Sequence, residues 1–109
     1  MIRALFICSQ NKLRSPTAEQ VLSKLQNVEA DSAGLNNDAE TPLSGEQLDW
    51  ATIVFVMEKT HRNKLSAKFR CYLNGKRVIC LDIPDEYEFM QPELIRPFEA
   101  RVGRHLQSA

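Results

Sequence analysis

Segments that predict strands alternate along this chain with segments whose apolar residues recur at the spacing of a helix. The segments that predict β-strands cover residues 2–7, 28–33, 53–57 and 77–81. The segments that predict helices cover residues 16–25, 43–50, 60–69 and the chain from 92 onward. Pro97 falls inside the last of these, and because a proline costs a helix interior about 3 kcal/mol, we expect a break near it.

The first predicted helix has the clearest start signal. Ser15 directly precedes it and is expected to be its N-cap, and Pro16 fits the first helical turn. Apolar residues then follow at i, i+3, i+4 and i+7, which are Ala18, Val21, Leu22 and Leu25. This stripe predicts a helix that packs one face against a core.

The order of the elements predicts the fold class. The run 53–57 is apolar without alternation, which is typical of a parallel strand covered on both faces. Strands that alternate with helices predict an α/β fold, with a parallel sheet, right-handed crossovers and helices on both faces. Such sheets bind ligands at the carboxyl ends of their strands, and Cys8 directly follows the first predicted strand.

Length and charge narrow the range of functions. The 109 residues suffice for one hydrophobic core, so we expect a single domain spanning 1–109. The 14 basic and 14 acidic residues cancel, which gives no reason to expect nucleic acid or an anionic membrane as a partner. No apolar stretch approaches the roughly 18 residues of a transmembrane helix, and the first run is too short for a signal sequence. We expect a cytoplasmic location.

The cysteines and histidines do not form a metal-binding pattern. Cys8, Cys71 and Cys80 are odd in number and lack a pairing pattern, which suits reduced thiols in a reducing compartment. Neither His61 nor His105 stands at metal-ligand spacing from them. We expect both histidines to be surface residues, His61 on an exposed helix, and Cys80 to be a small side chain in a buried strand.

The loop after the first strand has the strongest chemical signal. Cys8, Arg14 and Ser15 form the pattern Cys-x5-Arg-Ser between a predicted strand and a predicted helix. A helix N-terminus directs backbone N–H groups at an anion, and an arginine binds two phosphate oxygens in one plane. Cysteine thiols in such surroundings lose their proton readily, and the thiolate is the nucleophile. The pattern predicts a phosphate-binding loop with a nucleophile. Taken one at a time, the same residues could be a buried thiol, a surface charge and an N-cap.

Four segments together resemble one protein family. Residues 7–19, with the sequence Ile-Cys-Ser-Gln-Asn-Lys-Leu-Arg-Ser-Pro-Thr-Ala-Glu, closely resemble the signature of the low-molecular-weight protein tyrosine phosphatases. Residues 31–34 and 56–58 resemble the ends of the family's second and third strands, and residues 83–87 resemble its Asp-Pro-Tyr segment. The resemblance implies a flavodoxin-like three-layer sandwich with a four-stranded parallel sheet in the order 2-1-3-4.

The resemblance also implies roles for the loop residues. Cys8 would attack a phosphomonoester and form a phosphocysteine, Arg14 would hold the phosphate, and Ser15 would donate a hydrogen bond to the thiolate. No metal or cofactor is needed for this scheme. The other residues expected to bind phosphate are Ser9, Gln10, Asn11, Lys12 and Leu13.

A carboxylic acid in the segment after the fourth strand would complete the reaction. Asp85 matches the family's general acid, which protonates the leaving group and then activates water, while Asp82 is a second candidate. Tyr87 would form a wall of the substrate pocket or pack against the last helix. The expected substrate is a phosphotyrosine protein or a small aryl phosphate.

The chain departs from the family in ways that leave other functions open. Gln10 stands where the family usually has glycine, and Leu13 where many members have a second cysteine that protects the nucleophile. Glu86 and Glu88 add negative charge to the acid segment. The alternatives are a catalytically impaired phosphatase that binds phosphotyrosine, a thioredoxin-coupled arsenate reductase that relays a disulfide through Cys71 or Cys80, and a sugar-transport phosphocarrier.

Overall fold

The computed structural model describes most of the chain. The described residues are 2–8, 14–24, 28–35, 39, 41–73, 75–82, 95–96 and 99–102, with backbone only for 14–16. Within them, four strands form one parallel sheet in the order β2-β1-β3-β4. These strands are β1 (Ile2–Cys8), β2 (Val28–Gly34), β3 (Ile53–Val56) and β4 (Arg77–Cys80). The sheet and its strand order confirm the predicted flavodoxin-like α/β class.

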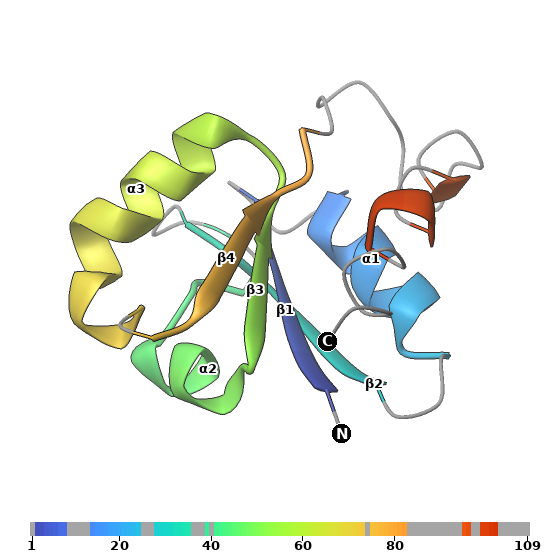
Figure 1. Cartoon of the computed structure of the whole chain (residues 1–109), viewed down its shortest axis with the longest axis horizontal. Helices are drawn as coiled ribbons and strands as arrows, with labels where there is room; N and C mark the ends of the chain where they lie inside the picture. Colours follow the sequence, from blue (N-terminus) through green and yellow to red (C-terminus); the bar gives the residue numbers. More distant parts are fainter. Residues whose placement is uncertain are drawn as a thin grey trace.

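Helices cover the sheet on both faces (Figure 1). On one face lies α1 (Arg14–Leu22), together with the helical residues 99–102 near the C-terminus. On the other face lie α2 (Gly45–Trp50) and α3 (Lys59–Phe69), which continues into the short 3₁₀ helix η1 (Arg70–Tyr72). This arrangement is the three-layer sandwich that the sequence predicted.

Strand β1 divides its side chains between two hydrophobic cores. Ala4, Phe6 and Cys8 belong to the core under α1, where Phe6 stacks on Phe55 of β3 with ring centroids 5.2 Å apart. Leu5 and Ile7 belong to the core under α2 and α3. Both faces of the strand are buried from Ala4 onward, and residues 4–7 are accordingly all apolar, as in parallel strands between two helical layers, whereas Arg3 is exposed.

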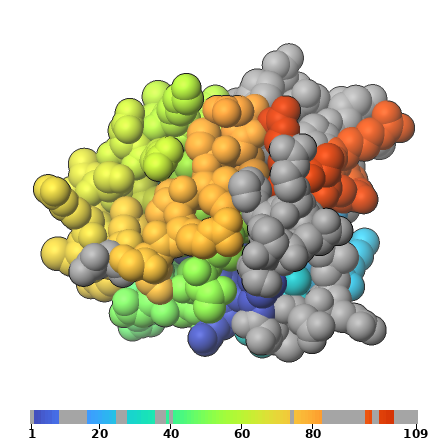
Figure 2. All heavy atoms as spheres, in the orientation of Figure 1, coloured from blue at the N-terminus to red at the C-terminus, as the bar shows by residue number. Residues whose placement is uncertain are grey.

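Strand β4 lies at one edge of the sheet, which explains why it is less buried than expected. Cys80 and its neighbours in β4 are half-buried rather than buried, because β3 pairs with only one side of the strand. In the space-filling view, atoms of β4 (orange) lie at the surface beside those of α3 (yellow to green) (Figure 2). The expectation that Cys80 sits in a fully buried strand was therefore wrong.

The first residues of the three helices differ by one or two positions from those predicted. Helix α1 begins at Arg14, so Ser15 lies inside its first turn and is not its N-cap. Helix α2 begins two residues later than predicted, at Gly45, because the Ser44 hydroxyl accepts a hydrogen bond from the Gln47 backbone and the Gln47 side chain accepts one from the Ser44 backbone. This capping box fixes the helix start. Leu25 and Pro97, named in two of the helix predictions, lie outside the described residues.

Candidate functional site

Cys8 lies at the carboxyl end of β1, between the neighbouring strands β2 and β3. Its side chain is 3% exposed and shares a hydrophobic core with Ala18 of α1. Helix α1 begins at Arg14, so residues 9–13 connect the thiol-bearing strand to the N-terminus of the helix. A strand that ends at Cys8 and a helix on the far side of the motif are what the Cys-x5-Arg pattern predicted.

Backbone hydrogen bonds hold the strand ends around Cys8 together. The Cys8 carbonyl accepts a hydrogen bond from Leu35 N at 2.9 Å, and the Ile7 carbonyl accepts one from Met57 N at 3.3 Å. Further along the edge, the Val56 carbonyl accepts a hydrogen bond from Leu81 N at 2.9 Å. The carboxyl edge of the sheet is therefore held in place from β2 to β4, and Cys8 sits in its middle.

A polar contact links the first helix to the second strand. The Ser32 hydroxyl donates a hydrogen bond to Glu19 Oε1 at 2.5 Å. Ser32 is 4% exposed, and its carbonyl and the Asp31 carboxylate accept hydrogen bonds from Gln47 Nε2. Sequence reasoning matched Glu19 and Ser32 to family segments but gave them no role. The contact fixes α1, and with it Arg14, relative to the sheet.

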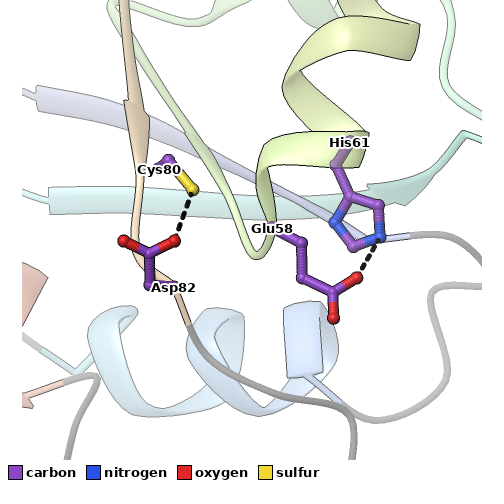
Figure 3. Close-up of polar contacts among 4 residues, drawn as sticks. All are labelled: Glu58, His61, Cys80 and Asp82. Carbon is purple, nitrogen blue, oxygen red and sulfur yellow. Dashed lines mark hydrogen bonds and ion pairs between the residues drawn. The ribbon is translucent and has the colours of Figure 1, made fainter.

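Glu58 and His61 form a second polar pair at this edge of the sheet (Figure 3). His61 Nε2 lies 3.5 Å from Glu58 Oε2, and the histidine side chain is 2% exposed whereas that of Glu58 is 40% exposed. The expectation that His61 is a surface residue was wrong. His61 precedes the buried Leu65 by one helical turn, so both lie on the face of α3 that packs on the sheet. The i, i+4 spacing from His61 through Leu65 to Phe69 was a signal that could have revealed this.

At the end of β4, the Cys80 thiol donates a hydrogen bond to Asp82 Oδ1 at 3.3 Å (Figure 3). Burial raises the pKa of the Cys80 thiol above its ordinary value. The Asp82 carboxylate adds to this effect, because it is negatively charged and accepts the hydrogen bond of the protonated thiol. Cys80 packs against the core under α2 and α3, whereas Cys8 belongs to the core under α1. The two thiols thus lie on opposite faces of the sheet.

Several predicted site residues cannot be placed. Arg14 and Ser15 are described by their backbone in the first turn of α1. The other predicted site residues lie outside the described residues, and they are Ser9, Gln10, Asn11, Lys12, Leu13, Asp85 and Tyr87. Asp82, the second candidate for the acid, is exposed and has φ 54, a left-handed conformation that aspartate tolerates better than most residues.

Two further observations concern only the described part of the chain. It contains no group of three or more histidine, cysteine, aspartate or glutamate side chains that could hold a metal ion. None of its helices has the length and apolar character needed to cross a membrane.

Comparison of the sequence with protein-family models and with curated proteins finds no match. Comparison of the structure finds similar solved structures. An arginine phosphatase, YwlE from Geobacillus stearothermophilus, superposes with a TM-score of 0.78 and 24% identity over 99% of this chain and 94% of that chain. A low-molecular-weight protein tyrosine phosphatase from T. tengcongensis gives a TM-score of 0.81 at 19% identity over the whole of both chains.

A third similar structure is the tyrosine phosphatase Wzb from Escherichia coli K30 in complex with phosphate. Its TM-score is 0.78 at 20% identity, with 99% of each chain covered. At these identities the comparison establishes the fold, and the match extends over nearly the full length of each protein. The chain has the fold of the low-molecular-weight protein tyrosine phosphatases, as the resemblance in its sequence predicted.

Proposed function

We propose that this protein hydrolyses phosphomonoesters through a phosphocysteine intermediate on Cys8. The observation that carries the proposal is the position of Cys8 at the carboxyl end of a central strand, followed in sequence by a loop and a helix that begins at Arg14. A helix N-terminus is a favourable site for an anion, because unpaired backbone N–H groups and the helix dipole both favour negative charge. The similar solved structures are named as phosphatases, one of them in complex with phosphate.

In the first step, the Cys8 thiolate attacks phosphorus, an S–P bond forms and the bond to the leaving-group oxygen breaks. Arg14 and the backbone N–H groups of residues 9–14 hold the equatorial oxygens of the transferring phosphoryl group. Preorganised donors and correct positioning supply most of the rate enhancement in phosphoryl transfer. Ser15 donates a hydrogen bond to the thiolate, and Asn11 braces the loop.

Asp85 acts in both steps. It gives its proton to the departing oxygen and then takes a proton from the water that attacks the phosphocysteine. That attack breaks the S–P bond, releases inorganic phosphate and restores the thiolate of Cys8. We favour Asp85 over Asp82 because the Asp82 carboxylate accepts the hydrogen bond from Cys80, whose side chain lies on the face of the sheet opposite to Cys8.

The substrate we favour is a phosphotyrosine protein or a small aryl phosphate, with Tyr87 as a pocket wall. An arginine phosphatase shares the fold with the tyrosine phosphatases, so phosphoarginine is the natural comparison substrate. The reduced thiols favour a reducing compartment, and we place the protein in the cytoplasm. All three cysteines are among the described residues, and none of them forms a disulfide.

The arrangement of the cysteines does not favour an arsenate reductase. Such an enzyme must pass a disulfide from the nucleophile to a second cysteine, and a disulfide requires Cα atoms within about 7 Å and Cβ atoms that face each other. Cys8 and Cys80 point to opposite faces of the sheet, and Cys71 is exposed in η1, beyond α3. Neither offers Cys8 a resolving partner.

The proposal is tested by measuring turnover of p-nitrophenyl phosphate, a phosphotyrosine peptide and a phosphoarginine peptide. The wild type should hydrolyse the aryl phosphate, and Cys8→Ser should not. Cys71→Ser is the matched control, because it replaces an exposed cysteine in η1 that the proposal does not use and should retain activity. A wild type that binds phosphate but turns over none of the three substrates would instead indicate a phosphate-binding protein.

A further inference from the structure

Arg101 binds the main chain at the point where it leaves β4. Its guanidinium Nη1 donates hydrogen bonds to the carbonyl oxygens of Leu81 and Asp82, at 2.5 and 2.9 Å. These two carbonyls directly follow the last residue of the strand, Cys80. A residue near the C-terminus thus holds the first turn after the sheet.

The helical segment that carries Arg101 is itself anchored. Val102, the next residue, is completely buried in the core under α1, together with Leu22 and Leu81. In the space-filling view, atoms of this segment (red) adjoin the end of β4 (orange) (Figure 2). Because Val102 fixes the backbone, Arg101 reaches the two carbonyls from a fixed position.

The turn that Arg101 binds has an unusual backbone. Asp82 has φ 54, the only positive φ at a residue other than glycine in the described part of the chain. Such conformations persist where the surroundings hold them, and they cluster at functional sites. Three sets of hydrogen bonds hold the turn at Asp82. Arg101 donates to the carbonyls of Leu81 and Asp82. Leu81 N donates to the Val56 carbonyl, and the Cys80 thiol donates to the Asp82 carboxylate.

The turn is the last described part of the chain before Asp85, which follows Asp82 by three residues in the sequence. We propose that Arg101 is a positioning residue for the general acid: by holding the carbonyls of Leu81 and Asp82, it fixes the exit of β4 from which the acid segment starts. This inference rests on the proposed function, because it takes Asp85 as the acid. Both hydrogen bonds that Arg101 donates to the described residues of this turn go to main-chain oxygens, so we take it to act through the segment rather than on the substrate.

The geometry suits arginine better than lysine. One guanidinium nitrogen carries two N–H groups in a fixed plane, so it can serve two adjacent carbonyls with a defined orientation. A lysine ammonium at this position keeps the charge but donates from a single flexible point. Arg101→Lys should therefore retain the stability of the fold and lose part of the positioning, whereas Arg101→Met removes both hydrogen bonds.

The test compares wild type, Arg101→Lys and Arg101→Met, with Arg96→Met as the matched control. Arg96 is exposed and precedes Arg101 in the same C-terminal region. We would measure kcat on a phosphotyrosine peptide and on p-nitrophenyl phosphate, the Kd for vanadate, and hydrogen exchange of the amides in residues 81–90. The phosphotyrosine peptide has a poor leaving group, so its hydrolysis needs the general acid. Hydrolysis of p-nitrophenyl phosphate needs the acid less, because p-nitrophenolate is a good leaving group.

If Arg101 positions the acid, Arg101→Met should lose roughly tenfold or more in kcat on phosphotyrosine, but no more than the roughly 10²–10⁴-fold that a general acid contributes. Its loss on p-nitrophenyl phosphate should be smaller, its vanadate Kd should stay unchanged, and exchange should be faster in 81–90. Arg101→Lys should fall between it and the wild type, and Arg96→Met should match the wild type.

Equal losses on both substrates together with weaker vanadate binding would show a merely structural role and overturn the inference. A folded Arg101→Lys or Arg101→Met with unchanged kcat would also overturn it. If the wild type hydrolysed neither substrate, the proposed function would fail on that result alone. Hydrogen exchange of Arg101→Met would then show whether Arg101 holds the segment. Faster exchange confined to the amides of residues 81–90 would support this role, and unchanged exchange would refute it.

Discussion

The Ser32 hydroxyl donates a hydrogen bond to the Glu19 carboxylate, and this contact joins α1 to β2 beside the proposed nucleophile. Glu19 follows Arg14 in the same helix, and Ser32 lies two residues before Gly34, the partner of Cys8 in the sheet. The contact therefore relates the start of the helix to the strand end that bears the thiol. Two consecutive elements of the chain, α1 and β2, are thus joined beside the site through side chains that are 13 residues apart.

Removing this contact should destabilise the protein and weaken anion binding. Ser32→Ala leaves the carboxylate of Glu19 without its donor, and hydrogen bonds to charged groups contribute about 1.5–3 kcal/mol to folding. Urea unfolding should therefore show a free energy of unfolding that is lower by about 1.5–3 kcal/mol. Glu29→Ala, on the exposed side of the same strand, should change stability by no more than about 0.5 kcal/mol. If Ser32→Ala were as stable as Glu29→Ala, the contact would have no role in holding α1.

Oxidation should inactivate the protein without forming an internal disulfide. Leu13 replaces the cysteine that protects many of the related phosphatases, and Cys8 and Cys80 lie on opposite faces of the sheet. A nucleophilic thiolate that has no resolving cysteine is oxidised beyond sulfenic acid once peroxide reaches it. Activity lost to peroxide should return poorly with dithiothreitol. Full recovery, or a peptide mass that shows Cys8 joined to Cys71 or Cys80, would instead support the reductase alternative.

Cys80 should react slowly with iodoacetamide. Burial and the Asp82 carboxylate raise the pKa of its thiol, so at neutral pH less of it is thiolate, the reactive form. In a Cys8→Ser background, the exposed Cys71 should be labelled faster than Cys80, and the Cys80 rate should keep rising as the pH is raised above 9. Asp82→Asn removes the negative charge and should speed the labelling of Cys80. If Cys80 were labelled as fast as Cys71 at neutral pH, the claim that burial and Asp82 suppress its ionisation would be contradicted.

Asp85→Asn should slow hydrolysis of phosphotyrosine by roughly 10²–10⁴-fold, the usual contribution of a positioned acid. The loss on p-nitrophenyl phosphate should be smaller at the phosphorylation step, because p-nitrophenolate leaves with little help. Asp82→Asn is the matched control, since Asp82 is the other candidate in the same segment. If Asp82→Asn showed the leaving-group dependence and Asp85→Asn did not, the acid would be assigned to the wrong residue.

The pH profile gives an independent test of the same assignment. The first step needs Asp85 as a proton donor, so activity should fall with rising pH as Asp85 loses its proton. Asp85→Asn should flatten this alkaline limb. A wild-type profile with no alkaline limb would show that no acid takes part in the measured step.

The fold was predictable because its strands have a simple pattern. Residues 4–7 and 53–57 are apolar on both faces, and that pattern occurs in parallel strands between two layers of helices. The strand order came from the family resemblance and not from the pattern itself. Boundaries were less predictable, since the start of α2 depends on the Ser44–Gln47 capping box and the start of α1 lies within the phosphate-loop motif.

The site was predictable as far as its residues formed a local motif. Cys8 and Arg14 are close in the sequence, so their spacing alone indicated a phosphate loop. The contacts of Arg101 could not be predicted, because its partners are backbone carbonyls of residues 81 and 82, which have no sequence signature. The burial of His61 was visible in its spacing from Leu65, but the charged residues around it in α3 indicated an exposed helix.

The most direct test of the account is whether a phosphoryl group passes through Cys8. The wild type would be mixed with p-nitrophenyl phosphate, quenched rapidly and digested, and the peptide that contains Cys8 would be weighed by mass spectrometry. We expect the mass of one added phosphoryl group on Cys8, at higher occupancy in Asp85→Asn, because that variant hydrolyses the intermediate more slowly. Release of p-nitrophenol at an unchanged rate by Cys8→Ser, with no phosphoryl group on Cys8 in the wild type, would contradict the account.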